Sequence, residues 1–385
     1  MLTWTSSVIP SLTIALVGWR SVVCGSVAAQ SDANRKPAGS PFEQWDTNSD
    51  GYLSREEFPK RLPAGLFKQI DRDGDGRLSR KEDDRFRASR RSDGNGRRNG
   101  GDSANESLRL PQGATVNRDI IYEVIQGRKL PLDLYRPKST NPTALVIWIH
   151  GGGWKSGSKA GGGPAVFQLL QRGYAVASVE YRLSGEAVFP AAIEDCKAAV
   201  SFLRLHADKY NLDPKRFGVW GSSAGGHLVS LLGTTNDVDQ FDTHPVTRKA
   251  SSKVQAVCNW FGPSDFLRMN DFPSRINHDA VDSPESRFIG AAIQANPEKV
   301  QRANPANYAS AGDPPFLHLH GDQDQLVPFN QSEILHAALK SSGVETTLYK
   351  VVGGGHGFGG SKDSRDELIE KSVQFFESKL SPDLR

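Results

Sequence analysis

Between about residues 118 and 380, short apolar runs alternate with segments of helical periodicity. The apolar runs, typical of buried strands, span 144–149, 174–180, 217–220, 254–260, 316–320 and 346–351. The helical segments span 164–172, 191–208, 224–232, 331–341 and 363–380. Strands that alternate with helices form right-handed parallel crossovers. The pattern therefore predicts an α/β fold with a doubly wound, mostly parallel sheet, and runs 120–126 and 130–135 predict a hairpin ahead of it.

Charge and composition exclude several classes of protein. The 385 residues include 47 Lys and Arg against 44 Asp and Glu, which leaves a net charge of only +3. A dedicated nucleic-acid binder carries a much stronger basic field, so we expect no nucleic-acid partner. Three Cys are too few for a disulfide scaffold or a Cys-rich zinc module. No run of 18 apolar residues occurs, so we expect no membrane span in the mature chain.

Residues 1–29 have the features of an export signal. An apolar run at 8–19 is followed by small residues. Two overlapping small-residue sequences suited to signal cleavage end at Ala28 and at Ala29. We therefore expect a secreted or periplasmic protein. Residues 1–7 contain no Lys or Arg, so a disordered leader or a misplaced start codon is the alternative. Removal of the signal would leave Cys196 and Cys258, either as a disulfide or as two buried thiols.

Two twelve-residue segments near the N-terminus have the spacing of calcium-binding loops. Oxygen donors fall at positions 1, 3, 5, 7 and 12 of each segment, where position 7 contributes its backbone carbonyl. These residues are Asp46, Asn48, Asp50, Tyr52 and Glu57 in the first segment, and Asp71, Asp73, Asp75, Arg77 and Glu82 in the second. Each segment has Gly at position 6, where the chain turns sharply, and Leu53 and Leu78 at position 8 predict a short shared strand.

The paired segments resemble the EF-hand family, which implies bound Ca²⁺. The alternative is a pair of acidic turns. The predicted organisation is an EF-hand pair over 40–84, a flexible linker over 85–110 and an α/β domain over 111–385. The linker is rich in Arg, Ser, Gly and Asn, without apolar periodicity or interleaved aromatic residues. Binding of nucleic acid or of an acidic polysaccharide is the alternative interpretation of its Arg residues.

Two motifs in the α/β domain follow predicted strands. Residues 221–225 match G-x-S-x-G between a strand and a helix, which places Ser223 on a sharp turn as the candidate nucleophile. Residues 150–154 read H-G-G-G-W, and this loop offers backbone N–H groups to a developing oxyanion. We assign the oxyanion hole to Gly152, Gly153 and Ala224. A plain turn or a phosphate loop is the alternative, although no G-K-[ST] follows.

A catalytic triad of this type needs an acid and then a His later in the chain. Asp324 follows the strand 316–320 and is the preferred acid, with Asp322 as the second choice. His356 lies 32 residues beyond Asp324 in a glycine-rich loop and is the candidate base. We interpret His320 as a residue that ends its strand and His150 as a brace for its own loop.

With these motifs in this order, residues 118–380 resemble the α/β-hydrolase superfamily. Within it they are similar to hormone-sensitive-lipase-like carboxylesterases and to bacterial feruloyl and acetyl esterases. The resemblance also rests on 181–183, Tyr-Arg-Leu, and on 262–265, Gly-Pro-Ser-Asp. It implies a serine esterase that needs no cofactor for catalysis, with Ser223, Asp324 and His356 as its triad. The expected substrate is a small acyl ester or an acylated polysaccharide.

Three further expectations concern the pocket and the competing functions. Segment 266–306 is predicted to form a cap over the pocket, and Trp154 and Trp260 either line that pocket or pack in the core.

A prolyl-oligopeptidase-like peptidase has the same triad order, but no propeller-sized domain precedes the hydrolase here. A calcium-dependent binding or anchoring protein is the third possibility, against which the intact triad argues.

Overall fold

The computed structural model divides the chain into two compact units, residues 1–101 and 102–385. The residues that the structure describes are 42, 45–48, 50–58, 67, 70–71, 75–80, 82, 110–161, 165–236 and 238–381. The predicted signal peptide and the predicted linker lie outside these residues, apart from position 110 at the end of the linker. No helix in the described ranges has both the length and the apolar character that crossing a membrane requires.

The second unit contains an eight-stranded sheet in the order β10-β9-β8-β7-β5-β6-β4-β3. A hairpin starts it, formed by β3 (Thr115–Ile125) and β4 (Arg128–Arg136). The parallel strands are β5 (Thr143–Ile149), β6 (Ala175–Val179), β7 (Leu212–Ser222), β8 (Ala256–Trp260), β9 (Phe316–Gly321) and β10 (Thr346–Val351). The predicted mostly parallel α/β sheet is therefore confirmed.

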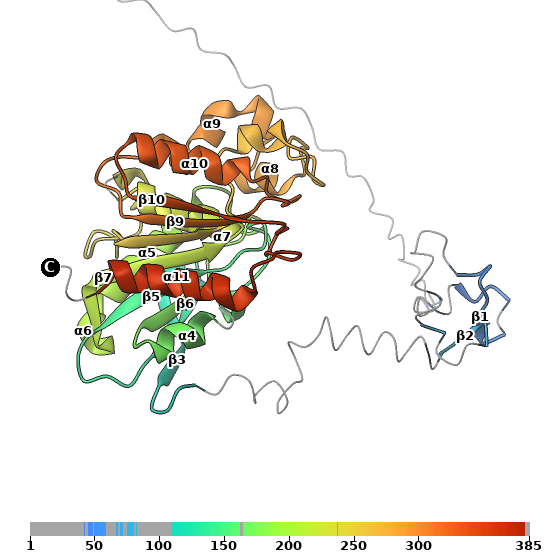
Figure 1. Ribbon diagram of the computed structural model, residues 1–385, viewed down its shortest axis with the longest axis horizontal. Helices are drawn as coiled ribbons and strands as arrows, with labels where there is room; N and C mark the ends of the chain where they lie inside the picture. Colours follow the sequence, from blue (N-terminus) through green and yellow to red (C-terminus); the bar gives the residue numbers. More distant parts are fainter. Residues whose placement is uncertain are drawn as a thin grey trace, which may run out of the picture. The chain divides into compact units, whose positions relative to one another are not determined.

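Helices cover both faces of this sheet. One apolar cluster joins the sheet to α5 (Ala191–Leu205), α7 (Ala224–Thr234) and α10 (Asn330–Ser341). The other cluster joins the opposite face to α4 (Ala165–Gln171) and α11 (Arg365–Lys379). Strand β5 is buried along its whole length, and its side chains alternate between the two clusters. In Figure 1, α11 lies in front of the sheet, and α10 runs along its β10 edge.

Two predicted elements differ from the structure in their bounds. The helix predicted at 191–208 ends at Leu205, because His206 has φ −106° and ψ 19°, and a separate turn, α6 (Ala207–Tyr210), follows. Strand β7 begins at Leu212, five residues before its predicted start. Its first half contains Pro214 and two polar residues that are not buried, so the apolar pattern does not reveal it.

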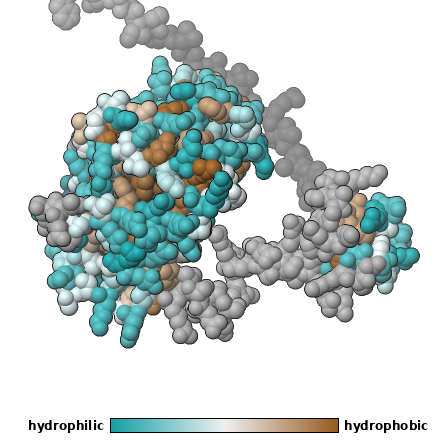
Figure 2. Space-filling model, viewed as in Figure 1, coloured by the Kyte–Doolittle hydropathy of each residue, from teal (hydrophilic) through white to brown (hydrophobic). Residues whose placement is uncertain are grey.

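The segment predicted to form a cap is built from short helical turns. They are η3 (Phe266–Asp271), α8 (Pro284–Ile289), η4 (Ile293–Ala295) and α9 (Pro297–Gln301). In Figure 1, α9 lies beyond α10, away from the sheet, and α8 lies beside the right-hand end of α10. The visible face of this unit mixes hydrophilic and hydrophobic residues (Figure 2).

The two described cysteines do not form a disulfide. Cys196 on α5 and Cys258 on β8 are both free and buried, and they belong to the clusters on opposite faces of the sheet. Burial raises the pKa of both thiols, that of Cys258 to about 12.

In the first unit, the two loops pair through a short antiparallel ribbon. Strand β1 (Tyr52–Leu53) pairs with β2 (Leu78–Ser79), and Leu53 lies opposite Leu78. This confirms the short strand predicted at position 8 of each loop. A small apolar cluster of Phe42, Leu53, Phe58, Phe67, Ile70 and Leu78 stabilises the unit.

Candidate active site

Ser223 sits on a strained turn between β7 and α7. Its φ of 54° and ψ of −122° lie outside the regions that residues with side chains usually adopt. The flanking glycines allow α7 to approach the strands closely. A Cβ at Gly221 would come within 2.3 Å of the Gly225 oxygen, and one at Gly225 within 2.1 Å of the Ile149 oxygen. The turn therefore needs glycine at both positions of G-x-S-x-G.

The structure brings together the three residues of the predicted triad. The Ser223 Oγ lies 3.0 Å from Nε2 of His356, and the Nδ1 of His356 lies 2.7 Å from Oδ2 of Asp324. They come from three separate strand ends: Ser223 follows β7, Asp324 follows β9, and His356 follows β10. Asp322 instead accepts a 2.8 Å hydrogen bond from the Gly353 N–H, so it braces the loop before His356.

The Asp324 carboxylate is held by an extensive set of hydrogen bonds. Its Oδ1 accepts bonds from the N–H groups of Leu326 and Val327, at 2.8 and 3.0 Å. Burial by itself would raise its pKa, but the imidazoles of His320 and His356 outweigh burial and hold the pKa of this carboxyl well below its usual range. Asp324 is therefore ionised at neutral pH, which favours a proton on the facing nitrogen of His356.

His320 has a role that the sequence interpretation missed. Its Nε2 lies 3.4 Å from Oδ2 of Asp324 and 2.8 Å from the Val327 oxygen, while its Nδ1 lies 2.7 Å from Oγ of Ser332. The ring is fully buried and lies near the same carboxylate oxygen as His356, so it helps to fix the position of Asp324. Its position four residues before Asp324 was a signal that could have indicated this contact.

The H-G-G-G-W loop places backbone amides beside Ser223. Gly152 and Gly153 have φ of 116° and 59°, and the Gly152 oxygen accepts bonds from the Lys155 and Ser156 N–H groups. Within the part of the chain that the structure describes, the N–H groups of Gly152, Gly153 and Ala224 donate to no protein acceptor. All three residues line one pocket with Ser223. They are therefore available to an oxygen atom bound there.

His150 braces this loop. Its ring stacks on Tyr181 at 4.3 Å, and the Tyr181 hydroxyl donates a 2.9 Å hydrogen bond to the His150 carbonyl oxygen. Its Nδ1 lies 2.8 Å from the Gly151 oxygen. These contacts agree with the structural role predicted for His150.

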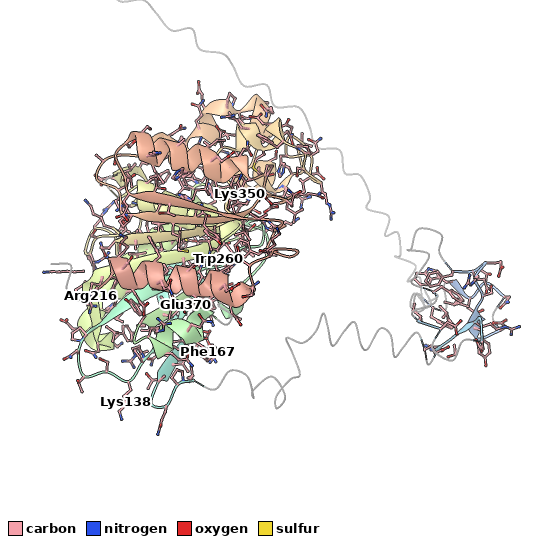
Figure 3. The ribbon with its side chains drawn as sticks, viewed as in Figure 1. Lys138, Phe167, Arg216, Trp260, Lys350 and Glu370 are labelled. Carbon is pink, nitrogen blue, oxygen red and sulfur yellow. The ribbon has the colours of Figure 1, made fainter. Side chains whose placement is uncertain are left out.

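The pocket has a volume of about 480 Å³ and is lined by residues from the loops at the strand ends and from the cap segment. The cap segment contributes Ile276, Pro284 and Glu285. Trp154 lines the pocket, although only 2% of it is exposed to solvent. Trp260 does not line it: its Nε1 donates a 3.0 Å bond to Ser372 of α11, and its ring packs 5.0 Å from Trp220. Figure 3 labels Trp260 near α11.

In the first unit, both predicted loops have the same internal hydrogen bonds. The N–H of glycine at position 6 donates to the position 1 carboxylate, from Gly51 to Asp46 at 3.0 Å and from Gly76 to Asp71 at 3.1 Å. Position 9 donates to position 12 in the same way, from Ser54 to Glu57 and from Ser79 to Glu82. The repeated pattern folds each loop back on itself, as a compact calcium loop requires.

The oxygen donors of the first loop are all described, and those of the second are described except for Asp73. Tyr52 lies in β1, and Arg77 immediately precedes β2. Hydrogen bonds from the Ser54 backbone and side chain, and from Thr47, lower the pKa of Glu57 to about 2, so this carboxyl group is ionised. Among the described residues, no three His, Cys, Asp or Glu side chains converge as a metal site. The donor set nevertheless suits Ca²⁺, because it consists of oxygens only.

Comparison with known proteins assigns both units to families. The BD-FAE family model matches residues 132–339, which is more than half of the chain and includes Ser223 and Asp324. The chain belongs to the BD-FAE family. The EF hand model matches residues 41–62 and 64–82, the two predicted calcium loops. The α/β-hydrolase and EF-hand resemblances inferred from the sequence are therefore confirmed.

Relatives of this BD-FAE protein are named as esterases. It is 32% identical to esterase LipC of Mycobacterium tuberculosis over 59% of this chain and 56% of that protein. It is 30% identical to the probable carboxylic ester hydrolase LipM of the same organism, over 63% of this chain and 56% of that protein. The chain thus spans just over half the length of these curated relatives.

Solved structures extend the comparison. A truncated carbohydrate esterase from gut microbiota is 32% identical, with a TM-score of 0.61 over 69% of this chain and 96% of that one. A bifunctional GH43-CE protein of Bacteroides eggerthii is 35% identical, with a TM-score of 0.63 over 69% of this chain and 35% of that one. An esterase of Thermogutta terrifontis, at 24% identity and a TM-score of 0.57, shows the same fold.

We predict that Gly225→Ala destabilises this BD-FAE fold, because the added methyl group would push α7 away from the Ile149 oxygen. Overpacking of this kind costs about 1–3 kcal/mol in free energy of unfolding. Gly185→Ala is the matched control, since a Cβ there meets nothing within 4 Å. Urea denaturation of the two variants measures the difference. Equal stability of the two would contradict the close approach of α7.

Proposed function

We propose that this BD-FAE protein is a serine carboxylesterase. The observation that carries the proposal is the continuous contact from Ser223 Oγ through His356 to the ionised Asp324. Ser223 and His356 line a pocket together with backbone amides that have no acceptor among the described residues. The esterase names of its relatives support the same activity. No other group is needed for acyl transfer by such an arrangement, so we propose that catalysis uses no cofactor.

The proposed reaction proceeds through an acyl-enzyme. His356 takes the Ser223 proton while Oγ attacks the ester carbonyl carbon, and Asp324 stabilises the imidazolium that forms. The N–H groups of Gly152, Gly153 and Ala224 donate to the oxyanion, and one such donor is worth about 2.7–4 kcal/mol of transition-state stabilisation. His356 then protonates the leaving alcohol. Water, activated by the same imidazole, releases the acid and restores Ser223.

We propose short acyl esters, of the acetyl or feruloyl type, on a small alcohol or a polysaccharide as substrates. Two similar solved structures, at 32% and 35% identity, are described as a carbohydrate esterase and as a GH43-CE protein. The pocket of about 480 Å³ accommodates a short acyl group together with part of its alcohol. A long fatty acyl chain does not fit this volume as readily.

The esterase proposal predicts that Ser223→Ala abolishes hydrolysis of p-nitrophenyl esters, with roughly a 10⁶-fold loss of kcat. Wild type should prefer acyl chains of two to four carbons within a C2–C12 series. Ser222→Ala, at the neighbouring position, should retain the greater part of the activity. A folded wild-type protein inactive on every chain length, or an active Ser223→Ala variant, would contradict the proposal and favour a peptidase or a binding protein.

We also propose that the two EF-hand loops bind Ca²⁺ and stabilise the first unit. Glu57 would supply two carboxylate oxygens, and Asp46, Asn48 and Asp50 the side-chain oxygens of the turn. The ionised state of Glu57, due to its hydrogen bonds, supports this role.

Loss of an outer-shell partner weakens metal binding roughly 10- to 100-fold. Glu57→Gln removes a proposed direct ligand, so it should weaken calcium binding by more than this in a calorimetric titration. Glu56→Gln is the matched control, because the neighbouring residue occupies position 11 and supplies no ligand. Chelation of Ca²⁺ should leave the kcat of ester hydrolysis unchanged. Equal affinities of wild type and Glu57→Gln would contradict the assignment of the loop.

Export through residues 1–29 is a further proposal, supported by the apolar run and by the small residues at its end. It predicts that the protein recovered from the periplasm or medium of an expressing bacterium begins at Ala29 or Gln30. N-terminal sequencing measures this directly. A protein that stays in the cytoplasm with Met1 in place would contradict export.

A further inference from the structure

A buried carboxylate lies in the wall of the active-site pocket, outside the catalytic triad. Glu285 is the second residue of α8 and lines the same pocket as Ser223 and Gly153. Only 3% of the residue is exposed. Burying an ionisable side chain in a site meant only for an apolar acyl group would be costly. A carboxylate at this position therefore needs hydrogen-bond donors, and a bound substrate is one source of them.

The oxyanion loop holds α8 in place. A Cβ at Gly153 would contact the Pro284 side chain at 3.6 Å, so the start of α8 lies against this loop. One turn further along α8, the Phe288 ring stacks on Trp154 with centroids 4.6 Å apart. Glu285 lies between these two contacts in the sequence of α8. Its place in the pocket is therefore fixed by the same loop that supplies the oxyanion amides.

His278 faces one oxygen of this carboxylate. Its Nδ1 lies 3.1 Å from Oε2 of Glu285, although the geometry is not that of a regular hydrogen bond. Its Nε2 lies 3.0 Å from Oγ of Ser274, which itself donates to the Gln325 oxygen at 3.0 Å. His278 is 1% exposed, so it is locked between Ser274 and Glu285.

The other carboxylate oxygen has no hydrogen-bond donor in the part of the chain that the structure describes. Among the described residues, no Arg or Lys pairs with Glu285, and no hydrogen bond reaches its Oε1. An ionised carboxylate has about four acceptor positions and no donor. With no described protein group to satisfy them, the free positions of Glu285 in the pocket lining are open to a donor that enters the pocket, such as a hydroxyl group of the substrate.

We propose that Glu285, positioned by His278, accepts a hydrogen bond from a hydroxyl group on the alcohol moiety of the substrate and so selects esters of polyhydroxylated alcohols such as sugars. This inference rests on the proposed esterase function. An acetyl group carries no hydrogen-bond donor, so in acetyl esters the donor must belong to the alcohol. Glu285 is a specificity-determining residue in this scheme, and His278 is a positioning residue.

The test compares two acetyl esters that share a six-membered ring. One is an acetylated methyl xylopyranoside with two free hydroxyls, and the other is cyclohexyl acetate, which has none. Glu285→Gln should lower kcat/KM on the sugar ester roughly 10- to 100-fold, the range expected for a lost hydrogen bond to a charged group. It should leave kcat/KM on cyclohexyl acetate within about threefold of wild type.

Glu298→Gln is the matched control. Glu298 follows Pro297 at the start of α9, as Glu285 follows Pro284 at the start of α8, but it is exposed and lies outside the pocket lining. This control should behave as wild type on both esters. Unfolding midpoints of all variants establish that each is folded, and Glu285→Asp, which retains the charge, provides a second variant if Glu285→Gln does not fold.

A separate variant tests the positioning role of His278. His278→Gln should lower the preference for the sugar ester over cyclohexyl acetate without lowering kcat on cyclohexyl acetate. Because the residues act together, the double variant Glu285→Gln/His278→Gln should lose no more of this preference than Glu285→Gln alone. Additive losses would overturn the positioning role of His278.

The outcomes separate this inference from the proposed function. Equal losses on both esters, or no loss on either, would overturn the role of Glu285. A loss on methyl ferulate relative to methyl cinnamate, with the sugar ester unaffected, would place the hydroxyl on the acyl group and overturn the assignment to the alcohol. A wild type that cleaves cyclohexyl acetate but not the sugar ester would retain the esterase function and overturn this inference. A wild type that cleaves neither would overturn the esterase function itself.

Discussion

The close approach of α7 to the carboxyl ends of β5 and β7 is the constraint on which the site depends. Two glycines make this approach possible, because any side chain at Gly221 or Gly225 would collide with backbone oxygens. The same approach holds Ser223 in its strained conformation and places the Ala224 amide beside the H-G-G-G-W loop. Backbone packing therefore fixes the position of Ser223 and of the amides that we propose as oxyanion donors, without any need for a bound substrate.

Two carboxylates near this turn, those of Asp324 and Glu285, differ in how the protein surrounds them. Asp324 lies between two imidazoles and two backbone N–H groups, so its charge is stabilised from several sides. Glu285 contrasts with it, since among the described residues only the His278 imidazole faces its carboxylate. The described residues thus satisfy the carboxylate of Asp324, whereas the Glu285 carboxylate in the pocket lining keeps acceptor positions for which these residues supply no donor.

Local patterns were enough to predict the sheet, both EF-hand loops and the three residues that meet at the strand ends. These features depend on apolar runs and on short motifs whose spacing is itself the signal. The start of β7 at Leu212 was missed because Pro214 and its polar neighbours interrupt the apolar run. Glu285 was missed because its burial results from the contact of α8 with a loop some 130 residues earlier in the chain. The choice between pocket and core for Trp260 likewise depended on its long-range contact with Ser372.

The two described thiols have a consequence for handling this protein. Cys196 and Cys258 lie in separate apolar clusters, and their raised pKa values keep them protonated at neutral pH. A protonated, buried thiol is a poor nucleophile and a poor target for oxidants. The α/β unit should therefore reach the same fold in a reducing cytosol as in an oxidising exterior, and its production does not require an oxidative folding pathway.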